Sequence, residues 1–198
     1  MKVYNEHNVL RVEMTMNDPY MFKIYRYAEN QDISEEKRFM EMRKGVSDTA
    51  ARVEISKQII NRFTEHMSAV EDKSRLGEVL TSVAGKVIDH GKTFRAIDAF
   101  GKDKDLLLAI ADPAFDVHAI TNKKLQAALG GTAWAKGMDG TRLSGKITRH
   151  LRLLREHGLI RKLPNQRKYN LTDKGRKLTA AIEAASAASI NDLLKLAA

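Results

Sequence analysis

The stretch from residue 141 to residue 171 constrains the fold more than any other part of the chain. It opens with an apolar stripe at helical spacing and reaches Gly158, a residue type that commonly ends a helix in the left-handed conformation. Two short segments that are typical of strands follow, Leu159–Leu163 and Arg167–Leu171, on either side of the turn signal Pro164-Asn165-Gln166. The pattern predicts a helix over residues 141–157 joined directly to a two-stranded hairpin. The stripe consists of Leu143, Ile147, Leu151 and Leu154.

Helices are also predicted on both sides of this unit. Lys104–Ala111 is a short apolar run, and Asn122–Leu129 follows Thr121, whose side chain can cap a helix. After the hairpin, Thr172 can cap a last helix that runs towards Leu196. Three helices, a hairpin and a closing helix are the element order of a winged helix-turn-helix. We therefore predict that residues 101–198 form such a domain.

The connection before the third helix is long for this fold. A helix-turn-helix normally has a turn of about three or four residues, whereas Gly130–Gly140 is much longer. Either a loop is inserted here, or Thr132–Lys136 adds a helical turn, and both alternatives change how the third helix docks. Trp134, which lies in this stretch, is expected to cover the core of the small domain rather than to stack on a ligand.

The first half of the chain has a different pattern. Val9–Met16 alternates apolar and polar residues, which predicts a half-buried strand, and Tyr20–Tyr27 is expected to be the returning strand of a hairpin. Helical spacing then predicts helices over residues 47–70 and 74–88. Residues 1–100 are therefore expected to form a small α+β region of unassigned role. The whole chain is predicted to be mainly α with small β.

Charge separates the two halves clearly. The chain has 34 Lys and Arg against 25 Asp and Glu, which gives a net charge of +9. Residues 1–100 hold 16 side chains of each sign, so residues 101–198 carry the whole excess. Within residues 141–177 there are 12 basic side chains against only Glu156 and Asp173. This concentration favours a polyanionic partner over the alternative of a generally basic surface.

The third helix combines the apolar stripe with a basic opposite side. Such a helix fits the major groove of DNA, where Arg and Lys can pair with guanine edges. The hairpin after it can reach phosphates or the adjacent minor groove. The alternatives are an ordinary solvated helix face and a soluble hairpin tip. The predicted DNA-binding residues are Arg142, Ser144, Lys146, Thr148, Arg149 and Arg152 in the helix, and Arg161, Asn165, Gln166, Arg167 and Lys168 in the hairpin.

This module resembles a known family. The run Ile147–Ile160 (ITRHLRLLREHGLI) resembles the recognition helix and first wing strand of MarR-like winged-helix DNA-binding proteins. Tyr169–Gly175 (YNLTDKG) resembles their second wing strand and the cap of the following helix. The resemblance implies that the third helix contacts base edges around Lys146 and Arg149. It implies nothing about the DNA target.

A second resemblance extends over more of the chain. Val9–Asn17, Met42–Val46 and the C-terminal module are similar to a family of uncharacterised bacterial winged-helix proteins. Members of that family look longer at the N-terminus and have Tyr-Asp-Lys where this chain has Tyr4-Asn5-Glu6. The resemblance implies that the chain corresponds to the C-terminal part of a larger ancestral protein, and it implies no activity.

The sequence also disfavours several classes of protein. There is no Cys, which rules out disulfide scaffolds, thiol catalysis and cysteine-bound metals. No apolar run approaches the ~18 residues of a membrane span, and residues 1–11 lack the layout of a signal peptide. Together these features indicate a soluble, cytoplasmic protein.

No catalytic or metal-binding motif stands out. The six His have no metal-binding spacing, and His150 and His157 are expected to touch phosphate or solvent. Phosphate loops, nucleophile elbows and carboxylate clusters are missing from the sequence. Arg11 and Glu13 are expected to form a local ion pair rather than a catalytic surface. We therefore predict no enzymatic activity, no cofactor and no metal.

The sequence thus predicts sequence-specific or semi-specific binding of duplex DNA, by a transcriptional regulator or a mobile-element accessory protein. The alternative is the DNA-binding C-terminal part of a replication initiator or transposase whose catalytic part is missing. A third alternative is an adaptor that binds protein or RNA. A homodimer would place two recognition helices one DNA turn apart, through last-helix residues that could equally pack within one chain. These are Leu178, Ile182, Ala185, Ile190, Leu193 and Leu196.

Overall fold

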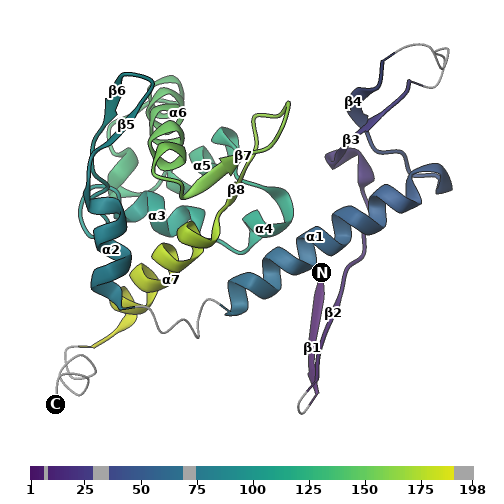
Figure 1. Cartoon of the computed structure of the whole chain (residues 1–198), viewed down its shortest axis with the longest axis horizontal. Coiled ribbons are helices and arrows are strands. Elements are labelled where there is room, and N and C mark those ends of the chain that lie inside the picture. Colours follow the sequence, from purple (N-terminus) through teal and green to yellow (C-terminus); the bar gives the residue numbers. More distant parts are fainter. Residues whose placement is uncertain (7–8, 29–35, 69–74, 190–198) are drawn as a thin grey trace. The chain divides into compact units, whose positions relative to one another are not determined.

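The structure, a computed structural model of the chain, describes residues 1–6, 9–28, 36–68 and 75–189 (Figure 1). In these residues the chain is mainly helical, and its strands form four antiparallel pairs. The prediction of a mainly α chain with small β elements is confirmed. None of the described helices is long and apolar enough to cross a membrane. The chain divides into two compact units, Met1–Thr64 and Glu65–Ala198.

The N-terminal unit consists of two separate strand pairs and most of a long helix. Its elements are β1 (Lys2–Glu6), β2 (Val9–Glu13), the 3₁₀ turn η1 (Pro19–Met21), β3 (Lys23–Arg26), β4 (Arg38–Glu41), the 3₁₀ turn η2 (Val46–Asp48) and α1 (Thr49–Ser68). The last turn of α1 belongs to the second unit. The long helix predicted from residue 47 is therefore confirmed within the described residues. Arg11 and Glu13 form the predicted local ion pair, 2.5 Å apart on β2.

The hairpin predicted between Val9–Met16 and Tyr20–Tyr27 is wrong. β2 pairs with β1, and β3, which lies within the second stretch, pairs with β4. The reason is local, because Pro19 fixes its own backbone angle and the Asp18 carboxylate accepts the main-chain N–H of Tyr20 at 3.2 Å. The chain therefore makes a 3₁₀ turn where the hairpin turn was expected.

Asp48 is the best-connected buried charge of the N-terminal unit. Its carboxylate accepts the main-chain N–H of Arg43 at 2.8 Å and the Nε and Nη2 of the same residue at 3.0 and 2.8 Å. These hydrogen bonds lower the pKa of Asp48 to about 2, against the effect of burial. The pair joins the segment after β4 to the start of α1, beside the fully buried Met42.

The C-terminal unit begins with a helix and a hairpin and continues with the predicted run of helices and strands. Its elements are α2 (Leu76–Ala84), β5 (Val87–Asp89), β6 (Lys92–Phe94), α3 (Lys104–Ile110), α4 (Ala114–His118), α5 (Asn122–Leu129), the 3₁₀ turn η4 (Ala133–Ala135), α6 (Gly140–Glu156), β7 (Ile160–Lys162), β8 (Tyr169–Leu171) and α7 (Asp173–Ala187). The helices predicted over 104–111, 122–129 and 141–157 are confirmed to within a residue at each end. Thr121 and Thr172 cap α5 and α7 as predicted, and Gly158 has a φ of +72°.

The structure departs from prediction between residues 85 and 100. The helix predicted over 74–88 ends at Ala84, and the β5–β6 hairpin follows it. His90 and Gly91 at its tip have φ values of +45° and +71°, which fit the twist of a tight hairpin turn. The compact unit also starts earlier than the boundary expected at residue 100, because Val83, Ile97 and Ala99 belong to the same buried cluster as the C-terminal helices.

One continuous core holds the C-terminal unit. The apolar stripe of α6 is buried as predicted, against α3, α5 and α7. Leu178 and Ile182 are fully buried in this core, so they pack within one chain. Ala185 is half-buried, and the other three candidate dimer residues lie outside the described residues.

The hairpin after α6 is widened by a third strand-like segment. Ile120 donates its main-chain N–H to Tyr169 O at 2.7 Å and accepts the N–H of Tyr169 at 2.9 Å. This bridge ties the residue before α5 to the start of β8. A Cβ on Gly175 would collide with the main-chain carbonyl of Leu159, so only glycine allows α7 to begin this close to β7.

Candidate nucleic-acid interface

The outward face of α6 is set by its buried stripe. Because the stripe lies against the core, helical geometry turns Arg142, Gly145 and Arg149 to the opposite side. All three are exposed, and the Asp139 carboxylate caps the helix by accepting the N–H of Arg142 at 2.7 Å. The predicted basic outer side is therefore present from the first turn of the helix to just past its middle.

The β5–β6 hairpin contacts the C-terminal half of α6 at Arg152. The guanidinium carbon of Arg152 lies 5.1 Å from the centre of the Phe94 ring, and its Nε lies 4.0 Å from the Glu156 carboxylate. Figure 1 shows this hairpin on one side of α6 and the β7–β8 hairpin on the other. Arg152 therefore contacts the fold itself, although its side chain remains 45% exposed.

Lys146 is held inside the unit rather than extended from the helix. Its Nζ donates to the main-chain carbonyl of Trp134 at 2.5 Å and lies 3.7 Å from the centre of the Trp134 ring. Burial lowers the pKa of Lys146. Trp134 is 7% exposed, so its predicted role as a cover for the core is confirmed. The long connection contains the short turn η4, and Lys146 holds this turn against α6.

Ser144 and Thr148 connect α6 to α5. The side-chain amide of Asn122 donates to the main-chain carbonyl of Ser144 and to the Thr148 hydroxyl, each at 2.9 Å. The Ser144 hydroxyl donates back to Asn122 Oδ1 at 3.1 Å, and Gln126 donates to the same oxygen at 2.6 Å. These two predicted contact residues thus have a clear role in fixing the angle between the two helices.

The expectation that His150 and His157 touch phosphate or solvent is wrong. The Nδ1 of His150 donates to Lys146 O at 2.8 Å, and its ring packs edge-on against Trp134 with centroids 5.0 Å apart. Burial lowers the pKa of His150, so the neutral ring is favoured. His157 is 3% exposed and donates from Nε2 to Arg95 O at 2.8 Å. Both rings contact Arg95 in the segment before α3, and no local pattern in the sequence predicts that contact.

Below these rings lies a buried ion pair. Asp103 accepts Nη1 and Nη2 of Arg95 at 2.6 and 2.7 Å and the main-chain N–H of Asp98 at 2.9 Å. Burial raises the pKa of Asp103, but these hydrogen bonds outweigh it and hold the pKa below its ordinary value. The Arg95 guanidinium also lies 3.3 Å from His150 Nε2. The pair therefore anchors the segment that follows β6 against the middle of α6.

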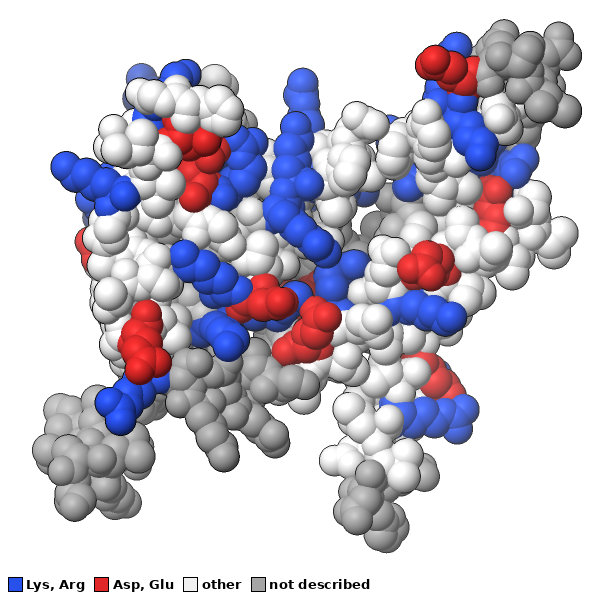
Figure 2. Space-filling model, viewed as in Figure 1, with Lys and Arg blue, Asp and Glu red and all other residues white. Residues whose placement is uncertain are grey.

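The β7–β8 hairpin presents a second basic surface. Arg161, Asn165 and Arg167 are exposed, whereas Gln166 and Lys168 are half-buried. Asn165 has a φ of +53°, a conformation that Asn tolerates better than most residues, so its clearest role is in the turn. Lys and Arg side chains gather over this hairpin in Figure 2.

Lys124 and His118, which were not among the predicted site residues, lie near Lys168 of the hairpin. Burial and then the charge of Lys168 lower the pKa of Lys124, and burial followed by Lys124 and Lys168 lowers that of His118. Lys124 Nζ also donates to His118 O at 3.4 Å. The three side chains therefore lie in one electropositive region. The bridge between Ile120 and Tyr169 of β8 brings the segment that carries His118 and Lys124 close to Lys168.

A hollow of about 580 Å³ opens beside the N-terminal half of α6. One wall is the connection after η4, and the other is the outward face of the helix. Four of its lining side chains are basic. The lining residues are Lys136, Gly137, Met138, Thr141, Arg142, Gly145, Lys146 and Arg149. Lys136, Gly137 and Gly145 were not predicted as site residues, because their role depends on the path of the long connection.

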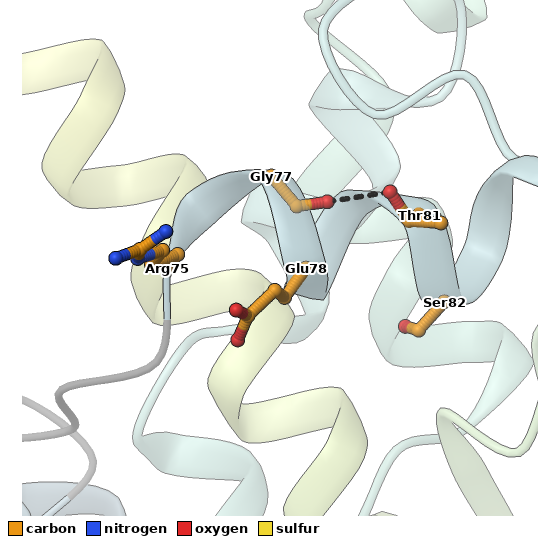
Figure 3. Close-up of a pocket in the computed structure, with 5 residues that line it drawn as sticks. All are labelled: Arg75, Gly77, Glu78, Thr81 and Ser82. Carbon is orange, nitrogen blue, oxygen red and sulfur yellow. Dashed lines mark hydrogen bonds between the residues drawn. The ribbon is translucent and has the colours of Figure 1, made fainter.

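A larger hollow along α2 carries no comparable chemistry. It measures about 720 Å³ and is lined by Arg75, Gly77, Glu78, Thr81 and Ser82. In Figure 3 the Thr81 hydroxyl donates to Gly77 O, at 2.7 Å, and the charged ends of Arg75 and Glu78 do not converge on a common point. This hollow lies along the side of a short helix, and its lining has no cluster of acidic or basic side chains.

Neither metal ligands nor known relatives add to this description. Among residues 1–6, 9–28, 36–68 and 75–189, no group of three His, Cys, Asp or Glu side chains is placed to hold a metal ion. Comparisons with protein-family models, with curated proteins and with solved structures found no match. The candidate interface therefore rests on its own geometry.

Proposed function

We propose that residues 101–198 form a winged-helix domain that binds duplex DNA, with the N-terminal half of α6 in the major groove. The order α3, α5, α6, β7, β8 and α7, together with the strand-like segment at Ile120, supports this fold. The β7–β8 hairpin is then the wing, placed to reach phosphates or the minor groove. The proposal needs binding alone, which suits a transcriptional regulator or a mobile-element accessory protein.

The observation that carries the proposal is the exposed, basic outer side of α6. Helix-turn-helix proteins contact base edges mainly with the first residues of the recognition helix. Here Arg142 in the first turn and Arg149 just past the middle of the helix are exposed and basic, while Arg152 one turn further on also contacts Phe94. Arg149 has no ion-pair or hydrogen-bond partner among the described residues, so a partner outside the chain can use its charge.

The experiment that tests the proposal is the salt dependence of duplex binding. We expect wild-type protein to bind with a steep slope of log affinity against log salt. Arg142→Ala/Arg149→Ala and Arg161→Ala/Arg167→Ala should each lower that slope by about one to two units, because a neutralised phosphate contributes about 0.9. The matched control is Arg11→Ala/Lys23→Ala, which removes two exposed charges from the N-terminal unit.

Two results would contradict the proposal. Absence of wild-type binding at about 50 mM salt would refute the proposal, since even non-specific DNA binding is detectable at that salt concentration. Equal slopes for the control and both test variants would show that net charge alone drives binding. Stronger binding to a single-stranded RNA of the same length would favour the adaptor alternative.

A further inference from the structure

The hollow beside α6 has the charge pattern of an anion site. Lys136 and Arg149 line it and have no ion-pair or hydrogen-bond partner within the part of the chain that the structure describes. Arg142 lies 3.8 Å from Asp139, but both side chains are more than 60% exposed, so this pair is weak. Lys146 adds charge at the back of the hollow, although its Nζ is bonded to Trp134. The lining thus contains four basic side chains and no carboxylate.

Gly145 provides an independent observation. It lies within α6 and lines the hollow, and a Cβ placed on it would meet no atom within 4 Å. Packing therefore does not require glycine here. Glycine inside a helix is less stable than alanine, because it loses more backbone freedom on folding. The glycine therefore leaves the helix backbone accessible on the side that lines the basic hollow, which is where Gly145 differs from Gly77 in α2, whose hollow has no cluster of basic side chains.

We propose that this hollow seats one backbone phosphate of the bound duplex, and that Gly145 keeps its floor open for it. The inference rests on the proposed function, since the phosphate belongs to duplex DNA. Cations from the connection and the helix converge on the hollow, which suits a compact anion. A base edge would call for a planar donor and acceptor pattern instead. The N-terminal end of α6 adds its own partial positive charge to the hollow.

Replacing Gly145 with alanine separates stability from binding. Gly145→Ala should raise the melting temperature by about 2–4 °C, and it should weaken binding at least about tenfold because a methyl group occupies the phosphate position. The matched control is Gly77→Ala in α2, where an added Cβ also meets no atom within 4 Å. That control should leave DNA affinity unchanged.

Lys136→Ala and modified DNA test whether the ligand is a phosphate. Lys136→Ala should lower the salt slope by about one unit and weaken binding to unrelated duplexes equally. In a scan of duplexes that each carry one neutral methylphosphonate, one position should weaken wild-type binding strongly. The same position should matter little to Lys136→Ala and Gly145→Ala, because both variants already lack the contact.

The outcomes distinguish this inference from the proposed function. Wild-type binding that Gly145→Ala leaves intact would overturn the inference while the proposed function stands. If Lys136→Ala weakened binding to one DNA sequence only, the hollow would contact a base edge and not a phosphate. If Gly145→Ala lowered the melting temperature, the space beside Gly145 would not be open, and the inference would also be overturned. Absence of any wild-type binding would overturn both proposals.

Discussion

Removing the Asp103 carboxylate tests how the candidate interface is held. The side chain is 2% exposed and accepts three hydrogen bonds, two from Arg95 and one from the main chain of Asp98. In Asp103→Ala the Arg95 guanidinium and the Asp98 N–H lose their acceptor together. Because His150 and His157 both contact Arg95, the change should loosen the segment after β6 from α6.

The size of the effect follows from burial. Removing one partner of a buried ion pair costs about 3–5 kcal/mol. The Arg95 side chain is 37% exposed, so water can solvate the abandoned guanidinium. The cost should therefore lie at the lower end, about 3 kcal/mol. For a chain of this length the melting temperature should fall by about 6–12 °C.

The assay is thermal unfolding followed by circular dichroism, repeated in urea to check the midpoint. Asp103→Asn keeps one acceptor oxygen and should lose less stability than Asp103→Ala. Asp89→Ala is the matched control, because Asp89 pairs with a His90 side chain that is 90% exposed, and Tm should change by less than about 2 °C. A fall of less than about 2 °C for Asp103→Ala would refute the claim that this pair anchors the segment.

Three other perturbations test separate parts of the structure. Gly175→Ala should destabilise the chain by about 1–3 kcal/mol in urea titration, because its Cβ would meet a main-chain carbonyl just before β7. Hydrogen bonds from Arg43 hold the pKa of Asp48 at about 2, so the stability it contributes is full above the unfolded pKa near 3.9 and is lost as pH falls towards 2. Asp48→Asn should abolish this part of the acid transition. The hydrogen bond to Asp116 raises the pKa of His66, so its stabilisation is full below the ordinary pKa and disappears as pH rises through the raised value. His66→Gln should flatten the dependence of melting temperature on pH between 5 and 8.

Controls and contrary results are available for each of these. Gly77→Ala has open space for its Cβ and should be neutral or stabilising, so equal effects at both glycines would contradict the close-packing argument. For Asp48, an unchanged acid midpoint in the Asn variant would mean that other carboxylates set the transition. For His66, a wild-type protein that gains stability as pH rises from 6 to 8 would have the opposite sign from the one derived.

Local signals explain why so much of the C-terminal unit could be predicted. Thr121, Asp139 and Thr172 each accept an N–H in the first turn of a helix, and Gly158 ends α6 with a positive φ. These features depend on a few neighbouring residues and are therefore readable from the sequence. The buried stripe of α6 is equally local, because one helical period determines it.

Features that depend on distant segments could not be predicted in the same way. The pairing of β3 with β4, and the packing of β6 against Arg152, join residues far apart in the chain. Helical spacing also gives the direction in which a side chain leaves the helix but not where its end lies. Lys146 leaves α6 on a predicted outer position, yet its Nζ turns back to Trp134. The position of the Lys146 ammonium group is determined by the path of residues 130–140, which places the Trp134 carbonyl within its reach.

A basic side chain can contact DNA only where the fold leaves it exposed, so the position of the exposed charges matters more than their number. The stretch 141–177 holds 12 basic side chains, but several of them complete the fold. Arg176 lies within 2.6 Å of Glu65 and is 7% exposed, and Lys174 donates to the carbonyls of Ser82 and His157. Most of the cations that the fold leaves exposed in this stretch, among them Arg149 and Arg167, lie on α6 and on the β7–β8 hairpin. Exposed positive charge is thus concentrated on the two elements that a winged helix would bring to DNA, which is the pattern expected of a binding surface rather than of general solubility.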